Sequence, residues 1–166
     1  MQLVGIRRHG RPTEIARLEP DGEYVTVLAP LEVFWADPGN YTGSSSAGLS
    51  VPIGEVEEYV PPALPDARVI CVGLNYLKHV AEGSYRDEAL PQSPTLFARW
   101  ASTLTVSGAS IPVPANEDGL DWEGEIVAWV GQTLIDADPE EALAAVIGYS
   151  VFNDVTARRA QKATSQ

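Results

Sequence analysis

The stretch that decides the fold is Leu120-Asp121-Trp122-Glu123-Gly124-Glu125-Ile126-Val127, and apolar residues continue from it to Val130. Side chains of a strand alternate between its two faces, so the pattern predicts a strand over residues 122–130 with Glu123 and Glu125 on the same face. Apolar residues occur on both faces of this strand, which is typical of a buried strand. Buried carboxylates need a partner, because an unpaired buried charge is costly.

A third carboxylate, Asp154, ends the apolar run Gly148-Tyr149-Ser150-Val151-Phe152-Asn153. If that run lies alongside the first strand, Asp154 and the two glutamates bring three oxygen anions together. Three carboxylates suit a hard divalent cation, so we expect Mg²⁺ or Mn²⁺, with Ca²⁺ as a further candidate. The alternative is a solvent-facing strand that carries ordinary surface acids.

The composition is that of a globular chain. Its 166 residues are 45% hydrophobic and 20% charged, and a chain of this size buries roughly 70% of its unfolded surface. A net charge of −12 argues against nucleic acid as a partner, because phosphate binding needs clustered Lys and Arg. No apolar run approaches the roughly 20 residues that span a bilayer, and the N-terminus alternates instead of forming a signal peptide. The single cysteine, Cys71, lies in an apolar run and predicts a small buried thiol in a cytoplasmic protein.

Two domains are expected: residues 1–60 as a small β-rich N-terminal domain and residues 61–166 as a second domain, because prolines at 61, 62 and 65 punctuate the chain before the next strand. Strands are predicted at Gln2–Arg8, Ile15–Leu18, Tyr24–Leu28, Arg68–Val72, Thr95–Trp100, Thr103–Val106 and Val151–Asp154. A long loop or an interdomain link is predicted over residues 37–54. Residues 75–92 lack periodicity, which predicts a lid or else a disordered segment. Asp138 as cap and Pro139 in the first position predict a helix that ends just before Gly148, and a further helix is predicted to start near Thr156.

A histidine and a glutamate in the predicted lid form a second candidate feature. His79 and Glu82 are three residues apart, so in a helical turn they share a face and touch. A carboxylate beside an imidazole fixes its tautomer and raises its basicity, as a general base requires. The spacing alone is more often that of two solvated surface neighbours.

Five separate segments, in this order, resemble the fumarylacetoacetate hydrolase family over residues 66–162. They are Val69-Ile70-Cys71-Val72-Gly73-Leu74-Asn75-Tyr76 with His79 and Glu82; Pro94-Thr95-Leu96-Phe97; Leu120-Asp121-Trp122-Glu123-Gly124-Glu125; Gly148-Tyr149; and Asn153-Asp154-Val155-Thr156-Ala157-Arg158 with Gln161. Three features depart from the family pattern. Arg99 stands where a lysine is common, Arg159 stands where an aspartate is usual, and members of the family are longer.

The resemblance implies an α+β fold with a mixed β-sheet of the β-roll type, a small β-rich N-terminal region, and a homodimer. It also implies that residues 61–166 are a catalytic domain that is incomplete at its C-terminal end. It implies that Glu123, Glu125 and Asp154 bind the metal, that His79 is the base oriented by Glu82, and that Arg158 and Gln161 lie near the substrate. The reaction implied is metal-dependent hydrolysis of C–C bonds in acylpyruvate- or fumarylacetoacetate-like 1,3-dicarbonyl acids through an enolate. The alternatives are a 2-oxo acid decarboxylase, an enol–keto isomerase, or a non-catalytic truncated homologue.

Overall fold

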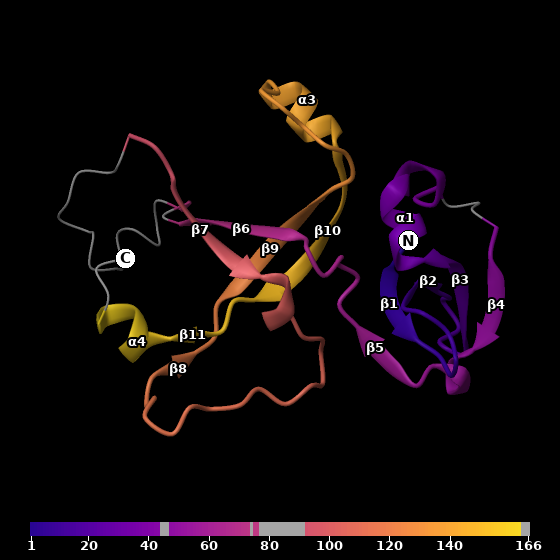
Figure 1. Cartoon of the computed structure of the whole chain (residues 1–166), viewed down its shortest axis with the longest axis horizontal. Coiled ribbons are helices and arrows are strands. Elements are labelled where there is room, and N and C mark those ends of the chain that lie inside the picture. Colours follow the sequence, from indigo (N-terminus) through magenta and orange to yellow (C-terminus); the bar gives the residue numbers. More distant parts are fainter. Residues whose placement is uncertain (44–46, 74, 77–91, 164–166) are drawn as a thin grey trace.

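The computed structural model describes residues 1–43, 47–73, 75–76 and 92–163. Its strands are β1 (Leu3–Arg7), β2 (Glu14–Leu18), β3 (Tyr24–Pro30), β4 (Leu49–Pro52), β5 (Glu58–Val60), β6 (Arg68–Gly73), β7 (Thr95–Trp100), β8 (Leu120–Asp121), β9 (Gly124–Val130), β10 (Val146–Asn153) and β11 (Thr156–Ala157). Its α-helices are α1 (Leu31–Ala36), α3 (Pro139–Ala144) and α4 (Arg158–Ala163), and short 3₁₀ turns occur at Pro38–Asn40, Ile53–Glu55 and Ala101–Thr103. Figure 1 shows two parts, one of β1–β5 with α1 and one of the later elements.

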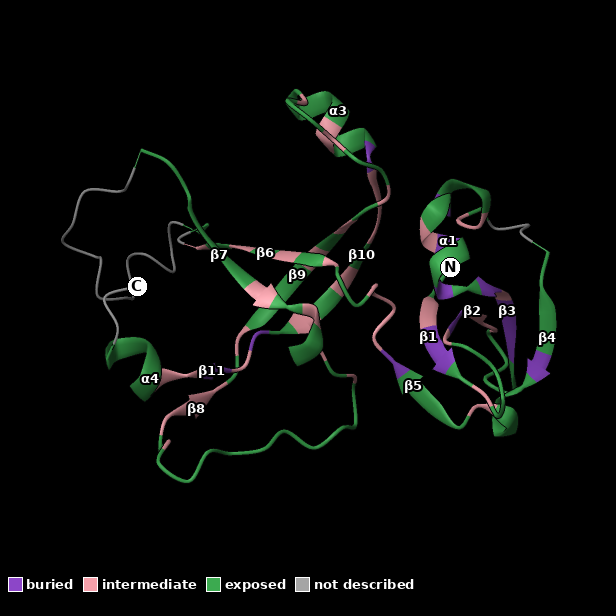
Figure 2. Ribbon diagram, in the orientation of Figure 1, coloured by how far each residue is buried: buried purple, intermediate pink, exposed green. Residues whose placement is uncertain are grey.

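The first part is a five-stranded sheet in the order β4-β3-β2-β1-β5. Each neighbouring pair is antiparallel, and β1 pairs with β5 through Gly5 and Val60. One face packs a cluster of Ile6, Ala16, Val25, Val27 and Val51. The other face packs against α1 through a cluster of Ile15, Ala29, Leu31 and Phe34. Apolar residues therefore line both faces of this sheet, and most of the buried side chains of the described chain lie here (Figure 2).

The second part consists of two-stranded antiparallel ladders. β6 pairs with β7, β9 with β10, and the short β8 with β11. In the β6–β7 ladder Val69 lies opposite Arg99, and in the β9–β10 ladder Phe152 lies opposite Glu125. Strands and a few short helices in separate segments make an α+β fold, as the sequence predicts.

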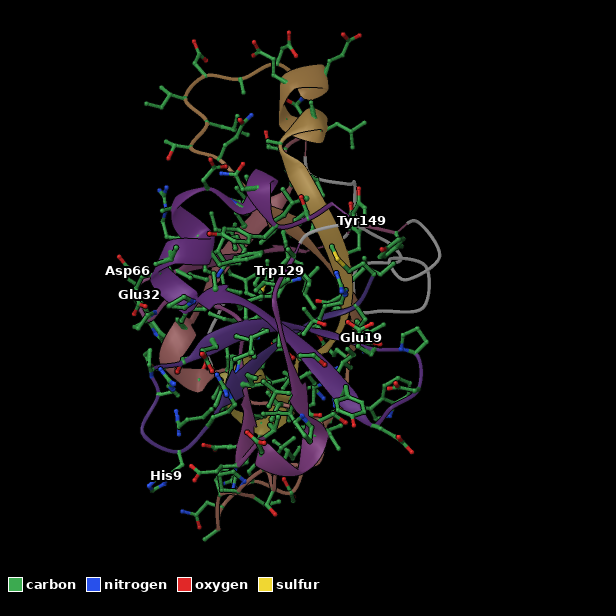
Figure 3. All side chains as sticks on the ribbon, turned by 90° about the vertical axis from the view of Figure 1, so that its right-hand side faces the viewer. His9, Glu19, Glu32, Asp66, Trp129 and Tyr149 are labelled. Carbon is green, nitrogen blue, oxygen red and sulfur yellow. The ribbon has the colours of Figure 1, made fainter. Side chains whose placement is uncertain are left out.

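Two tryptophans join the parts. The Trp35 ring of α1 stacks on the Trp129 ring of β9, with centroids 5.8 Å apart and an interplanar angle of 27°. Ile147 of β10 also packs against the cluster beside α1. In the side view of Figure 3, Trp129 lies near the middle of the projected molecule and His9 at its lower edge, and Trp129 is partly buried. The second part is thereby anchored on the N-terminal sheet.

Several sequence-based boundaries are wrong. Residues 37–54 contain β4 and two 3₁₀ turns, because Leu49–Pro52 completes the sheet by pairing with β3. Thr103–Val106 is not a strand; a 3₁₀ turn ends there and no ladder in the described ranges includes it. The helix that starts at Pro139 ends at Ala144, and Gly148 lies inside β10. α1 had no sequence prediction.

The sequence also predicts that the strand over residues 122–130 is buried on both faces, and in the structure it is not. The strand begins at Gly124, and the face that carries Ile126 and Val130 is exposed (Figure 2). Ile126 pairs with Val151 across the ladder, and their exposed fractions are 71% and 88%. Cys71, predicted as a buried thiol, is half-buried. Among the described residues, no helix has the length and apolarity that a bilayer crossing requires.

Candidate functional site

Backbone hydrogen bonds bring Glu123 and Asp154 together. Glu123 lies between β8 and β9, just before the point where Gly124 pairs with Asn153. The Glu123 N–H donates to Asn153 Oδ1 at 3.0 Å, and the Asp154 N–H donates to the Glu123 carbonyl at 3.0 Å. Two of the three predicted acids are thus neighbours through the closing end of the β9–β10 ladder.

Asp154 is the most buried of the predicted acids, and Arg99 of β7 is its partner. Arg99 Nε donates to Asp154 Oδ1 at 2.8 Å, and Arg99 Nη2 donates to Oδ2 at 3.0 Å. This hydrogen bonding raises the pKa of Arg99, against the opposing effect of burial. The Asp154 side chain is 6% exposed, so this bidentate pair supplies the partner that a buried carboxylate needs.

A second arginine holds Glu123 and Asp121. Arg158 Nη1 contacts Glu123 Oε1 at 2.5 Å, and Arg158 Nε donates to Asp121 Oδ2 at 3.0 Å. Burial lowers the pKa of Arg158, but the hydrogen bonds to Asp121 and Glu123 outweigh it and the pKa is raised. Arg158 Nη1 also donates to Gln161 Oε1 at 3.1 Å. The two residues predicted to lie near the substrate are therefore in contact with each other, and one of them contacts a predicted metal ligand.

The thiol of Cys71 on β6 is subject to the charges of all three predicted acids, Glu125 included. Burial raises the pKa of the Cys71 thiol, the charges of Asp154, Glu125 and Glu123 add to this rise, and Arg99 opposes it. We call Cys71, Arg99, Glu123, Glu125 and Asp154 the hairpin junction. It lies where the β6–β7 ladder faces the end of the β9–β10 ladder.

The donor chemistry of the hairpin junction suits a divalent cation, because carboxylate oxygens are what Mg²⁺ and Mn²⁺ prefer. The carboxylates do not converge, however. No three His, Cys, Asp or Glu side chains of the described ranges form a group that could hold a metal ion. Asp154 faces Arg99 and Glu123 faces Arg158 instead. Metal binding by Glu123, Glu125 and Asp154 therefore stays a prediction.

The predicted base and its partner, His79 and Glu82, lie outside the described residues, as does most of the predicted lid. Sequence reasoning identified Arg99 only as a departure from the family pattern and missed its pairing with Asp154. Strand alternation contained a signal for it, because Arg99 lies opposite Val69 on the face of the β6–β7 ladder that also carries Cys71 and Phe97.

The residues that form this site coincide with a family match. The family model for the C-terminal domain of fumarylacetoacetate hydrolase matches residues 68–166. The chain belongs to the fumarylacetoacetate hydrolase family. This confirms the resemblance that the five sequence segments indicated, and the matched range contains every residue of the hairpin junction.

Several curated relatives carry the names of tautomerases. The oxaloacetate tautomerase YisK of Bacillus subtilis is 36% identical over 137 residues, which is 80% of this chain and 43% of the relative. The mitochondrial oxaloacetate tautomerase of Rattus norvegicus is 33% identical over 108 residues, covering 65% of this chain and 33% of the relative. The chain thus spans less than half the length of the curated relatives it matches.

Solved structures share the fold over nearly the whole chain. A fumarylacetoacetate hydrolase from Exiguobacterium antarcticum is 30% identical with a TM-score of 0.67, covering 98% of this chain and 58% of that one. A 5-carboxymethyl-2-hydroxymuconate delta-isomerase from Mycobacterium smegmatis is 25% identical with a TM-score of 0.72, covering 100% and 59%. Family members with this fold therefore include proteins named as hydrolase and as isomerase.

Proposed function

We propose that this protein is a divalent-metal-dependent enzyme that acts on small 2-oxo acids or 1,3-dicarbonyl acids through an enolate. The observation that carries the proposal is the hairpin junction, where carboxylates from the β9–β10 end meet an arginine of β7 inside the family match. The names of the relatives support it, because oxaloacetate and the substrates of the named isomerase and hydrolase all reach an enol or enolate beside a carbonyl. Tautomerisation, isomerisation and C–C hydrolysis all pass through an enol or enolate, and they differ in what happens to it next.

In this proposal Glu123, Glu125 and Asp154 would hold Mg²⁺ or Mn²⁺, with Asp154 and Glu123 giving up their arginine partners to do so. The cation would supply a Lewis acid that stabilises negative charge on a substrate oxygen. Arg158 and Gln161 bind a substrate carboxylate by donating N–H hydrogen bonds. Arg158 is pre-oriented for this by Asp121, which accepts from its Nε at 3.0 Å and retains the side chain if Glu123 turns to the metal.

Keto–enol tautomerisation of a 2-oxo dicarboxylate is the reaction that the curated relatives favour. It requires a proton to move between carbon and a base, and His79 with Glu82 is the pair that the sequence offers for that role. Hydrolysis of an acylpyruvate is the second candidate, favoured by the hydrolase among the solved structures. It uses the same histidine to take a proton from water, which then attacks the carbonyl.

A substrate panel with matched metal conditions tests the proposal. Oxaloacetate enol–keto conversion is followed by ultraviolet absorbance, and acylpyruvate and fumarylpyruvate cleavage by product analysis, each with Mg²⁺, with Mn²⁺ and with EDTA. Decarboxylation of oxaloacetate is measured alongside as released CO₂. The proposal expects turnover of at least one substrate that EDTA abolishes and added metal restores. Absence of metal-dependent turnover on every substrate, in the full-length native protein, would leave the non-catalytic homologue as the better description.

The proposal also retains a cytoplasmic homodimer as the working form. Oligomeric state is measured by light scattering coupled to size-exclusion chromatography, and a monomer at micromolar concentration would contradict it.

A further inference from the structure

We propose that the Arg99 guanidinium is a built-in cation that competes with the divalent metal ion for Asp154. The inference rests on the metal site of the proposed function, and it concerns how that site is loaded. In the absence of metal, Arg99 neutralises Asp154; when a divalent ion binds, Asp154 exchanges the guanidinium for the ion.

The geometry of the pair makes exchange necessary. Both Asp154 oxygens accept from Arg99, at 2.8 Å from Nε and 3.0 Å from Nη2. A cation that takes either oxygen as a ligand must break or weaken one of these bonds. The two hydrogen bonds are charge-assisted and parallel, which makes them stronger than ordinary side-chain bonds. Metal binding at Asp154 therefore occurs against the cost of breaking or weakening this pair.

The burial of the two side chains shows which of them moves. The Asp154 side chain is 6% exposed and the Arg99 side chain 33% exposed. Asp154 is also fixed through its main chain, since its N–H donates to the Glu123 carbonyl and its own carbonyl accepts from Thr156 Oγ1. The carboxylate therefore stays in place, and the longer, more exposed arginine side chain leaves.

Arg99 has surroundings that can retain it after it leaves Asp154. Its guanidinium carbon lies 4.9 Å from the centroid of the Phe97 ring, which is a cation–π distance. The negative charge of Glu123 also acts on it. A small movement away from Asp154 thus keeps the guanidinium at the hairpin junction, over the Phe97 ring.

Arg158 differs from Arg99 in this respect. It contacts Glu123 but also donates hydrogen bonds to Asp121 and Gln161. Loss of Glu123 to a metal leaves Arg158 with other partners, and Glu123 is more exposed than Asp154, with 26% of its side chain accessible. The competition that we propose is accordingly specific to the Arg99–Asp154 pair.

Direct measurement of Mn²⁺ affinity tests the inference without any reference to turnover. Isothermal titration calorimetry, with electron paramagnetic resonance of free Mn²⁺ as an independent readout, is applied to the full-length native protein and to R99A, R99K and R68A. Arg68 is the matched control, because it lies in the same β6–β7 ladder with its side chain on the opposite, exposed face. R68A removes one positive charge, as R99A does, without touching Asp154.

Competition predicts that R99A binds Mn²⁺ about tenfold or more tightly than the native protein, and that R68A changes the affinity by less than about twofold. R99K keeps the charge but loses the bidentate fork, so it should bind several-fold more tightly than the native protein. R99K also decides the matter if R99A does not fold, as judged by circular dichroism.

Three results would overturn the inference. Equal tightening in R99A and R68A, with R99K unchanged, would mean that only overall charge matters. Weaker binding in R99A would mean that Arg99 supports the metal site. Absence of Mn²⁺ binding in all four proteins would remove the site itself. Tighter binding in R99A and R99K without turnover on any substrate would uphold the inference while the proposed reaction fails.

Discussion

Trp35 and Trp129 stack face to face between the N-terminal sheet and the β9–β10 ladder, with ring centroids 5.8 Å apart. Trp35 is also held by a hydrogen bond from its Nε1 to the Pro62 carbonyl at 2.7 Å, and Trp129 Nε1 donates to Ser150 Oγ at 3.0 Å. Trp35 is thus held by the segment that follows β5, and Trp129 by the neighbouring strand of its own ladder.

This contact should couple the stabilities of the two parts. W35A and W129A should each lower the free energy of unfolding by about 2–4 kcal/mol, since large aromatic truncations cost about 3–5 kcal/mol when fully buried. A double-mutant cycle should give a coupling of about 0.5–1.5 kcal/mol, the range for aromatic pairs. W100A, whose side chain is 74% exposed, is the control and should change stability by less than about 0.5 kcal/mol. Additive effects of W35A and W129A would mean that the contact between the two rings contributes no coupling free energy.

The start of α3 offers a separate stability test. The Asp138 side chain accepts from the Glu140 and Glu141 N–H groups, and the Glu141 side chain accepts from the Asp138 N–H, which completes a capping box. D138A should destabilise by about 1 kcal/mol in urea denaturation, because N-cap removal typically costs about that much. D138N keeps an acceptor oxygen and should cost only a few tenths of this. An equal loss in both variants would show that the charge at the helix start matters more than the cap.

Acid should weaken the contact between β2 and β3 through Glu19. Hydrogen bonds from Thr26 and then Arg17 hold the pKa of Glu19 below its ordinary value, against burial. A depressed folded-state pKa means that Glu19 stabilises the folded form above the unfolded-state pKa, and that this stabilisation is lost as pH falls through the folded-state value. E19Q should therefore flatten the decline of unfolding free energy between about pH 5 and pH 3. Denaturant titrations across that range check it, and a parallel decline in both proteins would contradict it.

The proposed roles in catalysis should be separable by mutation. H79A should reduce turnover roughly 10²–10⁴-fold while leaving Mn²⁺ binding nearly intact, because a general base contributes about that much. E82Q should cost less, since the side chain keeps a hydrogen-bonding group. E123A should remove both metal binding and activity. Steady-state kinetics and calorimetry on the same preparations check the order, and an H79A protein with native turnover would exclude His79 as the base.

Local sequence patterns predicted an element well where residues close in sequence determine it by themselves. Thr95–Trp100 has the predicted bounds, and Asp138-Pro139 marks the start of α3 because capping chemistry is local. Leu49–Pro52 could not be found in this way, since it becomes a strand by pairing with Tyr24–Val27 and lies after a loop rich in Gly and Ser. Glu123 shows the same limit: alternation placed it in a strand, but the ladder begins one residue later and Asn153 holds its backbone instead.

The acidic residues of the candidate site could be predicted from the sequence, whereas the arginines that pair with them could not. Carboxylates in a short apolar context are recognisable from sequence because burial makes them costly. The arginines that neutralise them come from elsewhere in the chain. Arg99, which pairs with Asp154, lies 55 positions before it, and Arg158, which pairs with Glu123, lies in α4. Such partners depend on how ladders face one another, which no local spacing encodes.

Cys71 gives this protein a native spectroscopic handle. It is the single cysteine in the sequence and belongs to the hairpin junction, where acids and Arg99 act on it in opposite senses. A small fluorinated thiol reagent would therefore attach at one defined position without any engineered cysteine. The ¹⁹F chemical shift of this label would respond to changes of charge at the neighbouring acids and Arg99. Titrations of ions or organic acids could therefore be followed in solution by the signal of one label.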